Sequence, residues 1–396
     1  MLAPIAMNMH VPAAAAIAET FSIPRPNASL TVTVYLWVFG STMMLVGLPA
    51  DRFGRRPSLL WGLGILGAGA LLAALSSGGL NRFIEGMGGV SAAPATLFTV
   101  LLFARAFKAV GAAAVVVIPR TMINDRTQGA EAVKLLGLLG TIMAAAPALA
   151  PVLGEILSAT LGWPAIFGAQ AVLAAVLFTA SFFLLPETRP ELEQSGATAV
   201  VQGEFRRVSE VAAPVAVMAL MTALYFAYLA AGADAMLMHF NEKSVALAAL
   251  LTSLASVYVI GNMTVARIAG RYELTSILRT GTIFTVVSLP VILWGSSYFV
   301  VSVGMCIYAY GNGLVMPTAL AMAGSVEPRL RARVMSVASA SPFLLGGGLA
   351  LLATTLNLTS WGRFRYMMLA CVILSTAIAW SRGRARRVPM GGELGE

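Results

Sequence analysis

The chain has 396 residues, of which 58% are hydrophobic and only 11% are charged. Soluble domains carry about 25% charged residues, so this chain has too few polar side chains to cover a water-facing surface. The composition therefore excludes a soluble two-domain enzyme. A membrane-spanning helix with its loop takes roughly 30–35 residues, and the length predicts an all-α polytopic membrane protein with about twelve spans.

The formal net charge of +9 raises the question of a nucleic-acid partner. The basic residues, however, stand in short clusters between apolar runs, as the positive-inside rule describes for membrane proteins. The two cysteines, Cys306 and Cys371, both fall inside apolar runs and indicate no disulfide framework. The charge therefore predicts membrane topology, with no nucleic-acid partner.

Apolar runs bounded by charged residues, Gly and Pro predict twelve spans. They lie near 1–18, 28–50, 57–76, 94–118, 133–157, 164–185, 211–238, 245–266, 277–296, 298–323, 333–356 and 361–381. The longest polar stretch, 186–210, separates two sets of six. We therefore expect an N-terminal six-helix half (1–185), a connector (186–210) and a C-terminal six-helix half with a basic tail (211–396).

The basic clusters fall on alternate loops, which predicts that the connector and both termini are cytoplasmic. A degenerate internal echo also indicates duplication of the halves. DRFGRRP (51–57) after the second span has a weak partner in ARIAGRY (266–272) after the eighth. Duplicated halves favour a substrate site between them.

The most specific motif is GLPADRFGRRPSLL (47–60). We expect Gly47 to let helices approach closely and Gly54 to permit a tight turn between two spans. Asp51 stands where a span meets water, next to the cations Arg55 and Arg56. A bare topological signal would need basic residues but not this spacing, and the segment resembles the motif G-x-x-x-D-R-x-G-R-R of the major facilitator superfamily.

Three further segments resemble the Bcr/CflA group of drug–proton antiporters within that superfamily. LLFARAFKAVGAAAVVVIPRTMINDR (101–126) is similar to the fourth span, APALAPVLGE (146–155) to the fifth and LGWPAIFGAQAVLAAVLFTASFFLLPETRP (161–190) to the sixth and its exit. In the fifth span the resemblance implies a bend at Pro147, Pro151 and Gly154. The cytoplasmic gate residues that it implies are Gly47, Asp51, Arg52, Gly54, Arg55, Arg56, Arg120 and Asp125.

The resemblance implies the major facilitator fold and proton-coupled export of a small, drug-like compound across the cytoplasmic (inner) membrane of a bacterium. The two halves would rock about a central cavity. An alternative within the same fold is a proton-coupled importer or facilitator of an anionic solute such as a siderophore. An enzyme is disfavoured, because no P-loop or catalytic cluster stands out, and we expect no cofactor beyond the proton gradient.

Ionisable residues at membrane depth are candidates for function because they are costly in hydrocarbon. Arg105 and Lys108 are three residues apart and share a helix face. Two cations there need compensating carboxylates or an anionic ligand. The alternatives are that Lys108 snorkels to an interface and that Arg105 belongs to a purely structural pair.

Two carboxylates complete the set of candidates. Asp234 lies late in the seventh span and is a candidate proton carrier, or else it marks the end of the helix. Glu155 lies near the outer end of the fifth span, where it pairs with Lys108 or stands as an exposed interfacial group. We predict Asp234, Glu155 and Arg105 for proton coupling.

The first span departs from the family pattern in two ways. Asn8 stands where the family commonly has an acidic residue, and a neutral amide cannot exchange a proton. The register of MNMHVPAAAAIAETFSIP (7–24) also leaves fewer residues than a full crossing needs. We therefore expect the sequence to begin within the first helix. The predicted substrate cavity comprises Asn8, Arg105, Lys108 and Asp234.

Overall fold

The computed structural model describes residues 2–87, 92–126, 146, 149–188, 208–269, 271–326, 328–356 and 360–381. Helices and the turns between them make up these residues, and no β-strand occurs within the described ranges. The all-α prediction is confirmed.

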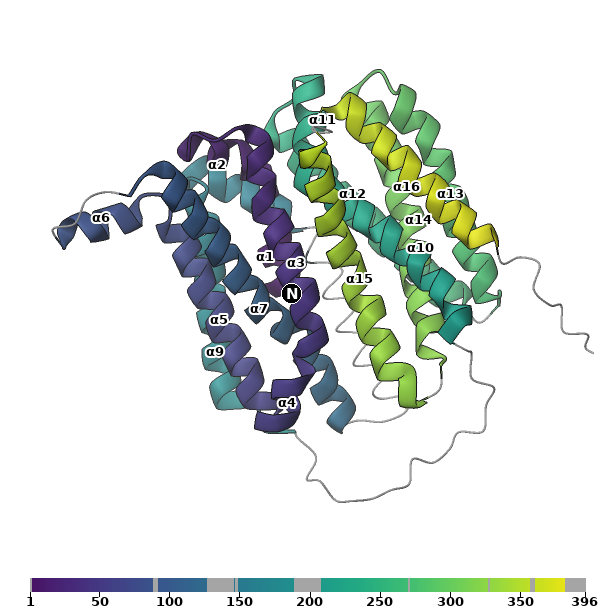
Figure 1. Ribbon diagram of the computed structural model, residues 1–396, viewed down its shortest axis with the longest axis horizontal. Coiled ribbons are helices and arrows are strands. Elements are labelled where there is room, and N and C mark those ends of the chain that lie inside the picture. The colour runs from purple at the N-terminus through teal and green to yellow at the C-terminus, as the bar shows by residue number, and fades with distance from the viewer. Residues whose placement is uncertain are drawn as a thin grey trace, which may run out of the picture.

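The helices before the connector build one side of the molecule (Figure 1). They are α1 (Leu2–Asn8), η1 (Val11–Ala13), α2 (Ala14–Thr20), η2 (Arg25–Ser29), α3 (Leu30–Leu45), α4 (Gly47–Phe53), α5 (Arg55–Leu75), α6 (Gly79–Gly86), α7 (Pro94–Arg126), the helix Leu149–Leu161 and α9 (Pro164–Leu184).

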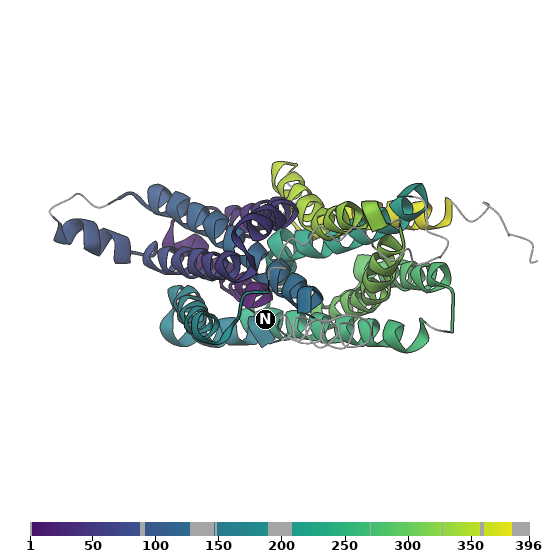
Figure 2. The ribbon, with the colours of Figure 1, turned by 90° about the horizontal axis from the view of Figure 1, so that it is seen from below.

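The helices after the connector build the other side. They are α10 (Val208–Ala227), the π-helical turn η3 (Tyr228–Gly232), α11 (Ala233–Phe240), α12 (Ser244–Ile268), α13 (Leu274–Trp294), α14 (Tyr298–Gly324), α15 (Pro328–Thr355) and α16 (Trp361–Ser381). Seen from below in Figure 2, the early helices (purple and blue) lie to the left and the last helices (green and yellow) lie to the right.

Ten helices in the described part of the chain are long and apolar enough to cross a membrane. Their bounds follow the predicted spans closely: the predicted 164–185, for example, is Pro164–Leu184. The predicted fifth span, 133–157, lies mostly outside the described residues, and its described part belongs to the helix Leu149–Leu161.

The prediction of one continuous first span over 1–18 is wrong. Helix α1 ends at Asn8, and the chain passes through the 3₁₀ turn η1 before α2 begins at Ala14. Pro12 lies in that turn, and proline has no N–H to donate to a helical carbonyl. The segment is therefore bent at the level where an unbroken helix was expected.

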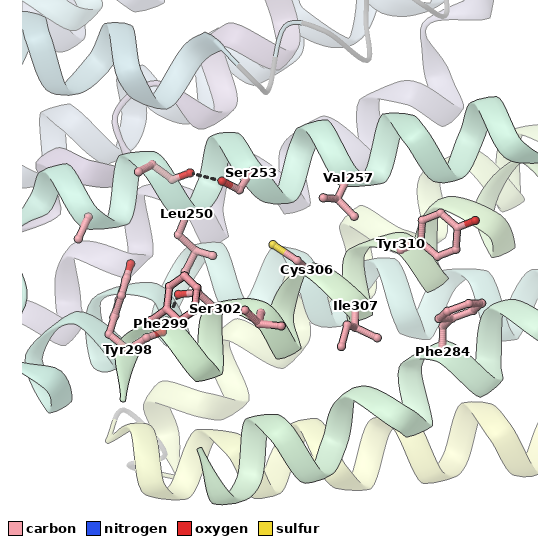
Figure 3. Close-up of a pocket in the computed structure, with 13 residues that line it drawn as sticks. Leu250, Ser253, Val257, Phe284, Tyr298, Phe299, Ser302, Cys306, Ile307 and Tyr310 are labelled. Atoms are coloured by element: carbon pink, nitrogen blue, oxygen red, sulfur yellow. Dashed lines mark hydrogen bonds between the residues drawn. The ribbon is translucent and has the colours of Figure 1, made fainter. Parts of the chain in front are cut away.

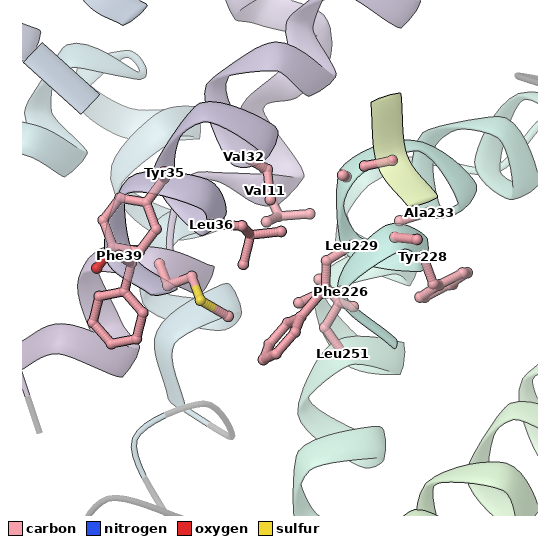
Figure 4. Packing of buried hydrophobic residues seen from close by; sticks show 14 of the residues in the cluster. Val11, Val32, Tyr35, Leu36, Phe39, Phe226, Tyr228, Leu229, Ala233 and Leu251 are labelled. Carbon is pink, nitrogen blue, oxygen red and sulfur yellow. The ribbon is translucent and has the colours of Figure 1, made fainter. Parts of the chain in front are cut away.

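The two sides meet along α3 and α15, which lie side by side at the centre of Figure 1. The rings of Phe39 and Phe343 stack edge to face with centroids 4.8 Å apart. Gly40 permits the approach, since a Cβ atom there would lie 3.0 Å from Leu344 Cγ. Figure 4 shows the apolar cluster that continues across this contact, with Leu36 on one side and Phe226 on the other.

Two turns identify the ends of the bundle. We call the end where α4 turns into α5 the Gly54 end, and the end where α11 turns into α12 the Asn241 end. Gly54 has φ +100°, a conformation that glycine adopts without strain. Asn241 has φ +54° and closes α11 in the left-handed region, where Asn is tolerated.

Candidate functional site

Helix α7 carries the two cations that the sequence singled out, and both lie inside the protein. The side chains of Arg105 and Lys108 are 0% exposed. The approach of α5 holds this part of α7 in place, because a Cβ atom at Gly69 would lie 2.7 Å from the backbone nitrogen of Lys108. The snorkelling alternative for Lys108 is therefore wrong.

Arg105 is held by backbone carbonyls and an aromatic face. Its Nε donates to the carbonyl of Thr31 at 2.9 Å, and its Nη1 donates to the carbonyl of Ala6 at 3.0 Å. The guanidinium carbon lies 4.5 Å from the centroid of the Tyr35 ring, within the range of a cation–π contact. The remaining nitrogen, Nη2, is buried and has no hydrogen-bond partner among the residues that the structure describes.

Lys108 shares one of these partners. Its Nζ donates to the Gln170 side-chain oxygen at 2.6 Å and to the Ala6 carbonyl at 3.2 Å. The ammonium also lies 4.7 Å from the centroid of the Phe167 ring. Gln170 was missed at the level of sequence, although a lone amide within the apolar run 164–185 is the kind of residue that needs a buried partner.

The break in the first span explains why the Ala6 carbonyl is available. Helix α1 ends at Asn8, and the last four carbonyls of a helix have no partner inside it. The C-terminal end of a helix also carries partial negative charge, which favours nearby cations. The two cations on α7 therefore converge on the end of α1.

The described residues supply no carboxylate to these cations. Of the two alternatives for Glu155, pairing with Lys108 is wrong: Glu155 accepts a hydrogen bond from the Ser244 hydroxyl at 2.6 Å. That contact joins the helix Leu149–Leu161 to the first residue of α12, and so links the two sides of the molecule.

Two further polar residues of the first segment, after Ala6, are buried. His10 is buried, with Nε2 3.3 Å from the Thr31 hydroxyl and its ring 5.8 Å from that of Phe167. Asn8 donates to the Pro4 carbonyl at 2.9 Å, while its side-chain oxygen is buried without a partner. His10 was not among the predicted site residues.

Asp234 does not join this cluster. It follows η3 on the other side of the molecule and forms a 3.1 Å ion pair with Arg25 of η2. The same Arg25 donates to the sulfur of Met238, one turn further along α11. Nothing in the sequence near Arg25 or Asp234 indicates this pairing.

At the Gly54 end, the motif residues meet within one side of the molecule. Arg55 Nε and Asp125 form a 2.9 Å ion pair. The carboxylate of Glu187 accepts from the backbone N–H groups of Arg55 at 2.9 Å and Arg56 at 3.2 Å, and so caps the start of α5. Arg126 donates to the Glu187 carbonyl at 2.9 Å.

The other predicted motif residues do not join these contacts in the described part of the chain, or lie outside it. The expectation that Gly47 allows a close helix contact is wrong, since a Cβ atom there would meet nothing described within 4 Å. The Arg52 guanidinium lies 5.3 Å from the Phe53 ring, and Arg120 is near the end of α7. The side chain of Asp51 and the whole of Pro147 lie outside the described part.

The expected bend of the fifth span is described only from Leu149 onward. Pro151 lies near the start of the helix Leu149–Leu161. Gly154 contacts the first segment so closely that a Cβ atom would lie 1.7 Å from the Met9 carbonyl oxygen. Gly154 therefore lets this helix pack against the break in the first span, where the Ala6 carbonyl is left without a helical partner.

A separate apolar cavity of about 560 Å³ lies among α12, α13 and α14 (Figure 3). Its walls include Leu250, Val257, Phe284 and Cys306, and the Ser253 hydroxyl beside them donates to the Ala249 carbonyl. None of the predicted site residues lines it. The cavity and the cation cluster are therefore different places in the fold.

Comparison with known proteins matches this arrangement to one family. The family model described as Major Facilitator Superfamily matches residues 1–256. A chloramphenicol resistance protein of Pseudomonas aeruginosa is 31% identical over 190 residues, and the multidrug resistance protein MdtL of Escherichia coli O9:H4 (strain HS) is 27% identical over 190 residues. These matches cover 48% of this chain and 41% and 44% of the two relatives.

Two solved structures share the fold over almost the whole chain. The human organic anion transporter MFSD10 (TETRAN) superposes with a TM-score of 0.66 at 15% identity, covering 96% of each chain. A D-xylose–proton symporter superposes with a TM-score of 0.67 at 13% identity, covering 95% of each chain. At these identities the likeness concerns the fold alone. With the family model matched over more than half of its length, the chain belongs to the Major Facilitator Superfamily, whose members are membrane transporters and not enzymes.

Proposed function

We propose that the protein exports a small drug-like compound by alternating access, driven by proton entry. The relatives named for chloramphenicol and multidrug resistance support the class of compound. The observation that carries the mechanism is the pair of polar contacts between the two sides at the Asn241 end, Arg25–Asp234 and Glu155–Ser244. These contacts have to separate when that end opens.

The positive-inside pattern supports an orientation for the gate. The Gly54 end carries the basic cluster of residues 52–56 and so faces the cytoplasm of a bacterial inner membrane. The Asn241 end then faces outward, and the structure corresponds to a state closed on that face. Opening it would complete the outward half of a transport cycle.

Proton coupling needs a titrating group whose surroundings differ between the two states. Asp234 and Glu155 both lie at the contact that breaks. A proton on Asp234 competes with Arg25 for the carboxylate, so acidification of the outer solution favours separation of that ion pair. Arg105 would act indirectly, by organising the charge of the N-terminal side.

The direct test is transport of chloramphenicol by the full-length protein in proteoliposomes with an imposed pH gradient. We expect gradient-driven transport together with proton movement in the opposite direction. The Asp234→Asn variant should lose the pH dependence. Glu242→Gln, which removes an exposed carboxylate at the same end, should keep it.

The same assay also tests the alternative that the protein imports its substrate. Uptake of a solute together with protons would give accumulation on the cytoplasmic side instead of export. Transport that is indifferent to the gradient and moves no protons would reject the antiport mechanism.

A further inference from the structure

We infer that Arg105 and Lys108 form a binding site for one carboxylate of an organic acid, and that such acids are among the compounds transported. The inference concerns substrate class and rests on the transport function proposed above. Two cations to which the described residues supply no carboxylate meet at one carbonyl oxygen, and a buried donor of Arg105 lies beside that contact.

Arg105 and Lys108 are two buried cations to which the described residues supply no carboxylate. Charges inside a protein are normally paired, because an unpaired ion loses its hydration without compensation. Both cations are 0% exposed, yet their described hydrogen-bond partners are neutral oxygens of Ala6, Thr31 and Gln170. One bound anion would reduce two uncompensated positive charges to one.

Arg105 also has a donor that no described residue accepts from. Its Nη2 is buried without a partner in the described part of the chain, although the neighbouring Nη1 is satisfied. A guanidinium offers two parallel N–H groups that match the two oxygens of a carboxylate. A carboxylate that takes over the Ala6 contact would engage Nη1 and Nη2 together.

The shared carbonyl shows where the anion's oxygen would lie. The Ala6 oxygen accepts from Arg105 at 3.0 Å and from Lys108 at 3.2 Å. A single oxygen atom can thus be reached by both cations from one helix face. A ligand carboxylate that displaced this carbonyl would share one full negative charge over its two oxygens, whereas the carbonyl oxygen carries only a partial charge.

The surrounding side chains favour an organic acid over a bare ion. The faces of Tyr35 and Phe167 lie 4.5 Å from the Arg105 guanidinium and 4.7 Å from the Lys108 ammonium. An anion that joins the two cations would therefore lie next to aromatic rings, which favours an anion with an apolar organic part over an inorganic ion. His10, the neighbouring polar ring, is buried with its ring 5.8 Å from that of Phe167.

The site is connected to the contact that closes the Asn241 end. Thr31, which accepts from Arg105 Nε, belongs to α3 immediately after η2, and η2 carries Arg25. A movement of η2 that breaks the Arg25–Asp234 pair therefore also shifts Thr31, whose carbonyl accepts a hydrogen bond from Arg105. This coupling gives the buried site a route to open with the gate.

The test is equilibrium dialysis of radiolabelled benzoate against the purified full-length protein, with benzamide as its neutral counterpart. We expect benzoate but not benzamide to bind. Lys108→Gln should weaken benzoate binding about tenfold or more, the effect of losing one charge-assisted hydrogen bond. Lys108→Arg keeps the charge and should retain binding, and Lys243→Gln, on the exposed loop before α12, is the matched control.

Chloride binding, measured by the same dialysis, distinguishes a site for an organic acid from a site for an inorganic counter-ion. If chloride binds and benzoate does not, the site holds an inorganic counter-ion, and the assignment to an organic acid is overturned. Equal binding of benzoate and benzamide by the wild-type protein overturns it as well, without reliance on any variant. Benzoate binding without transport would instead reject the transport function and leave the anion site standing.

Discussion

Arg25 and Asp234 form a 3.1 Å ion pair that joins the two sides of the molecule at the Asn241 end. One partner lies in η2, before the first long helix of the N-terminal side, and the other lies just after the π-helical turn η3 of the C-terminal side. π-Helical turns are frequent at functional sites. The pair therefore joins the two sides next to a break in the regular α-helical geometry.

Breaking the pair should open the Asn241 end modestly. The two side chains are 35% and 24% exposed, and an ion pair of this kind contributes at most about 1 kcal/mol. The measurement uses a background in which Cys306 and Cys371 are replaced by Ser and Ser29→Cys supplies the single thiol. We expect a membrane-impermeant maleimide to label this thiol up to about fivefold faster when Asp234→Asn is added.

The exchanged pair Arg25→Asp with Asp234→Arg is the control. It restores opposite charges in the same place and should return the labelling rate toward that of the parent. A rate that stays high in the exchanged variant would mean that the ion pair does not hold the end closed.

Gly154 should tolerate no side chain. A Cβ atom there would lie 1.7 Å from the Met9 carbonyl oxygen, which is backbone and cannot rotate away. We expect Gly154→Ala to cost about 1–3 kcal/mol of stability, as overpacked positions do, and to lower the thermal unfolding temperature. Gly168→Ala in α9, where a Cβ atom meets nothing within 4 Å, should be neutral or slightly stabilising.

Glu187 should stabilise the start of α5. Its two carboxylate oxygens accept from the N–H groups of Arg55 and Arg56, and loss of such a cap costs about 0.5–2 kcal/mol. We expect the unfolding temperature to fall in the order wild type, Glu187→Gln, Glu187→Ala, because Gln keeps one acceptor. An unchanged temperature in the Ala variant would contradict the capping role.

A negative charge at position 8 should oppose anion binding. Asn8 lies in the same short helix as Ala6, and its side-chain oxygen is buried without a partner. We expect Asn8→Asp to lower benzoate affinity about tenfold or more by supplying the missing counter-charge. Asn8→Ser, which is neutral, should bind benzoate like the wild type in the same dialysis experiment.

Gln170 offers a second position for the counter-charge. Its oxygen is 2.6 Å from the Lys108 ammonium, so Gln170→Glu places a carboxylate in direct contact with a cation. We expect this variant to lose benzoate binding and to keep its fold, measured by dialysis and by thermal unfolding. Gln170→Leu, by contrast, should lower stability by about 1–3 kcal/mol because the ammonium loses its acceptor.

The long spans were predictable because a bilayer fixes their length and composition. The predicted spans 57–76 and 245–266, for example, are Arg55–Leu75 and Ser244–Ile268 in the structure. The first span was mispredicted, since Pro12 breaks a run whose composition alone looks continuous. Local backbone chemistry overrode hydrophobicity there, and the break created the free carbonyl that organises the candidate site.

The sequence by itself determined the fold class and the family, because hydropathy and motif spacing are local properties of the chain. It also identified Arg105 and Lys108 as ionisable residues at membrane depth. Only the tertiary structure decided which groups these residues meet. Asp234 pairs with Arg25, Glu155 binds Ser244, and Lys108 turns to Gln170. Each partner comes from a helix distant in the sequence, and helix packing, which depends on the shape of whole faces, brings it within reach.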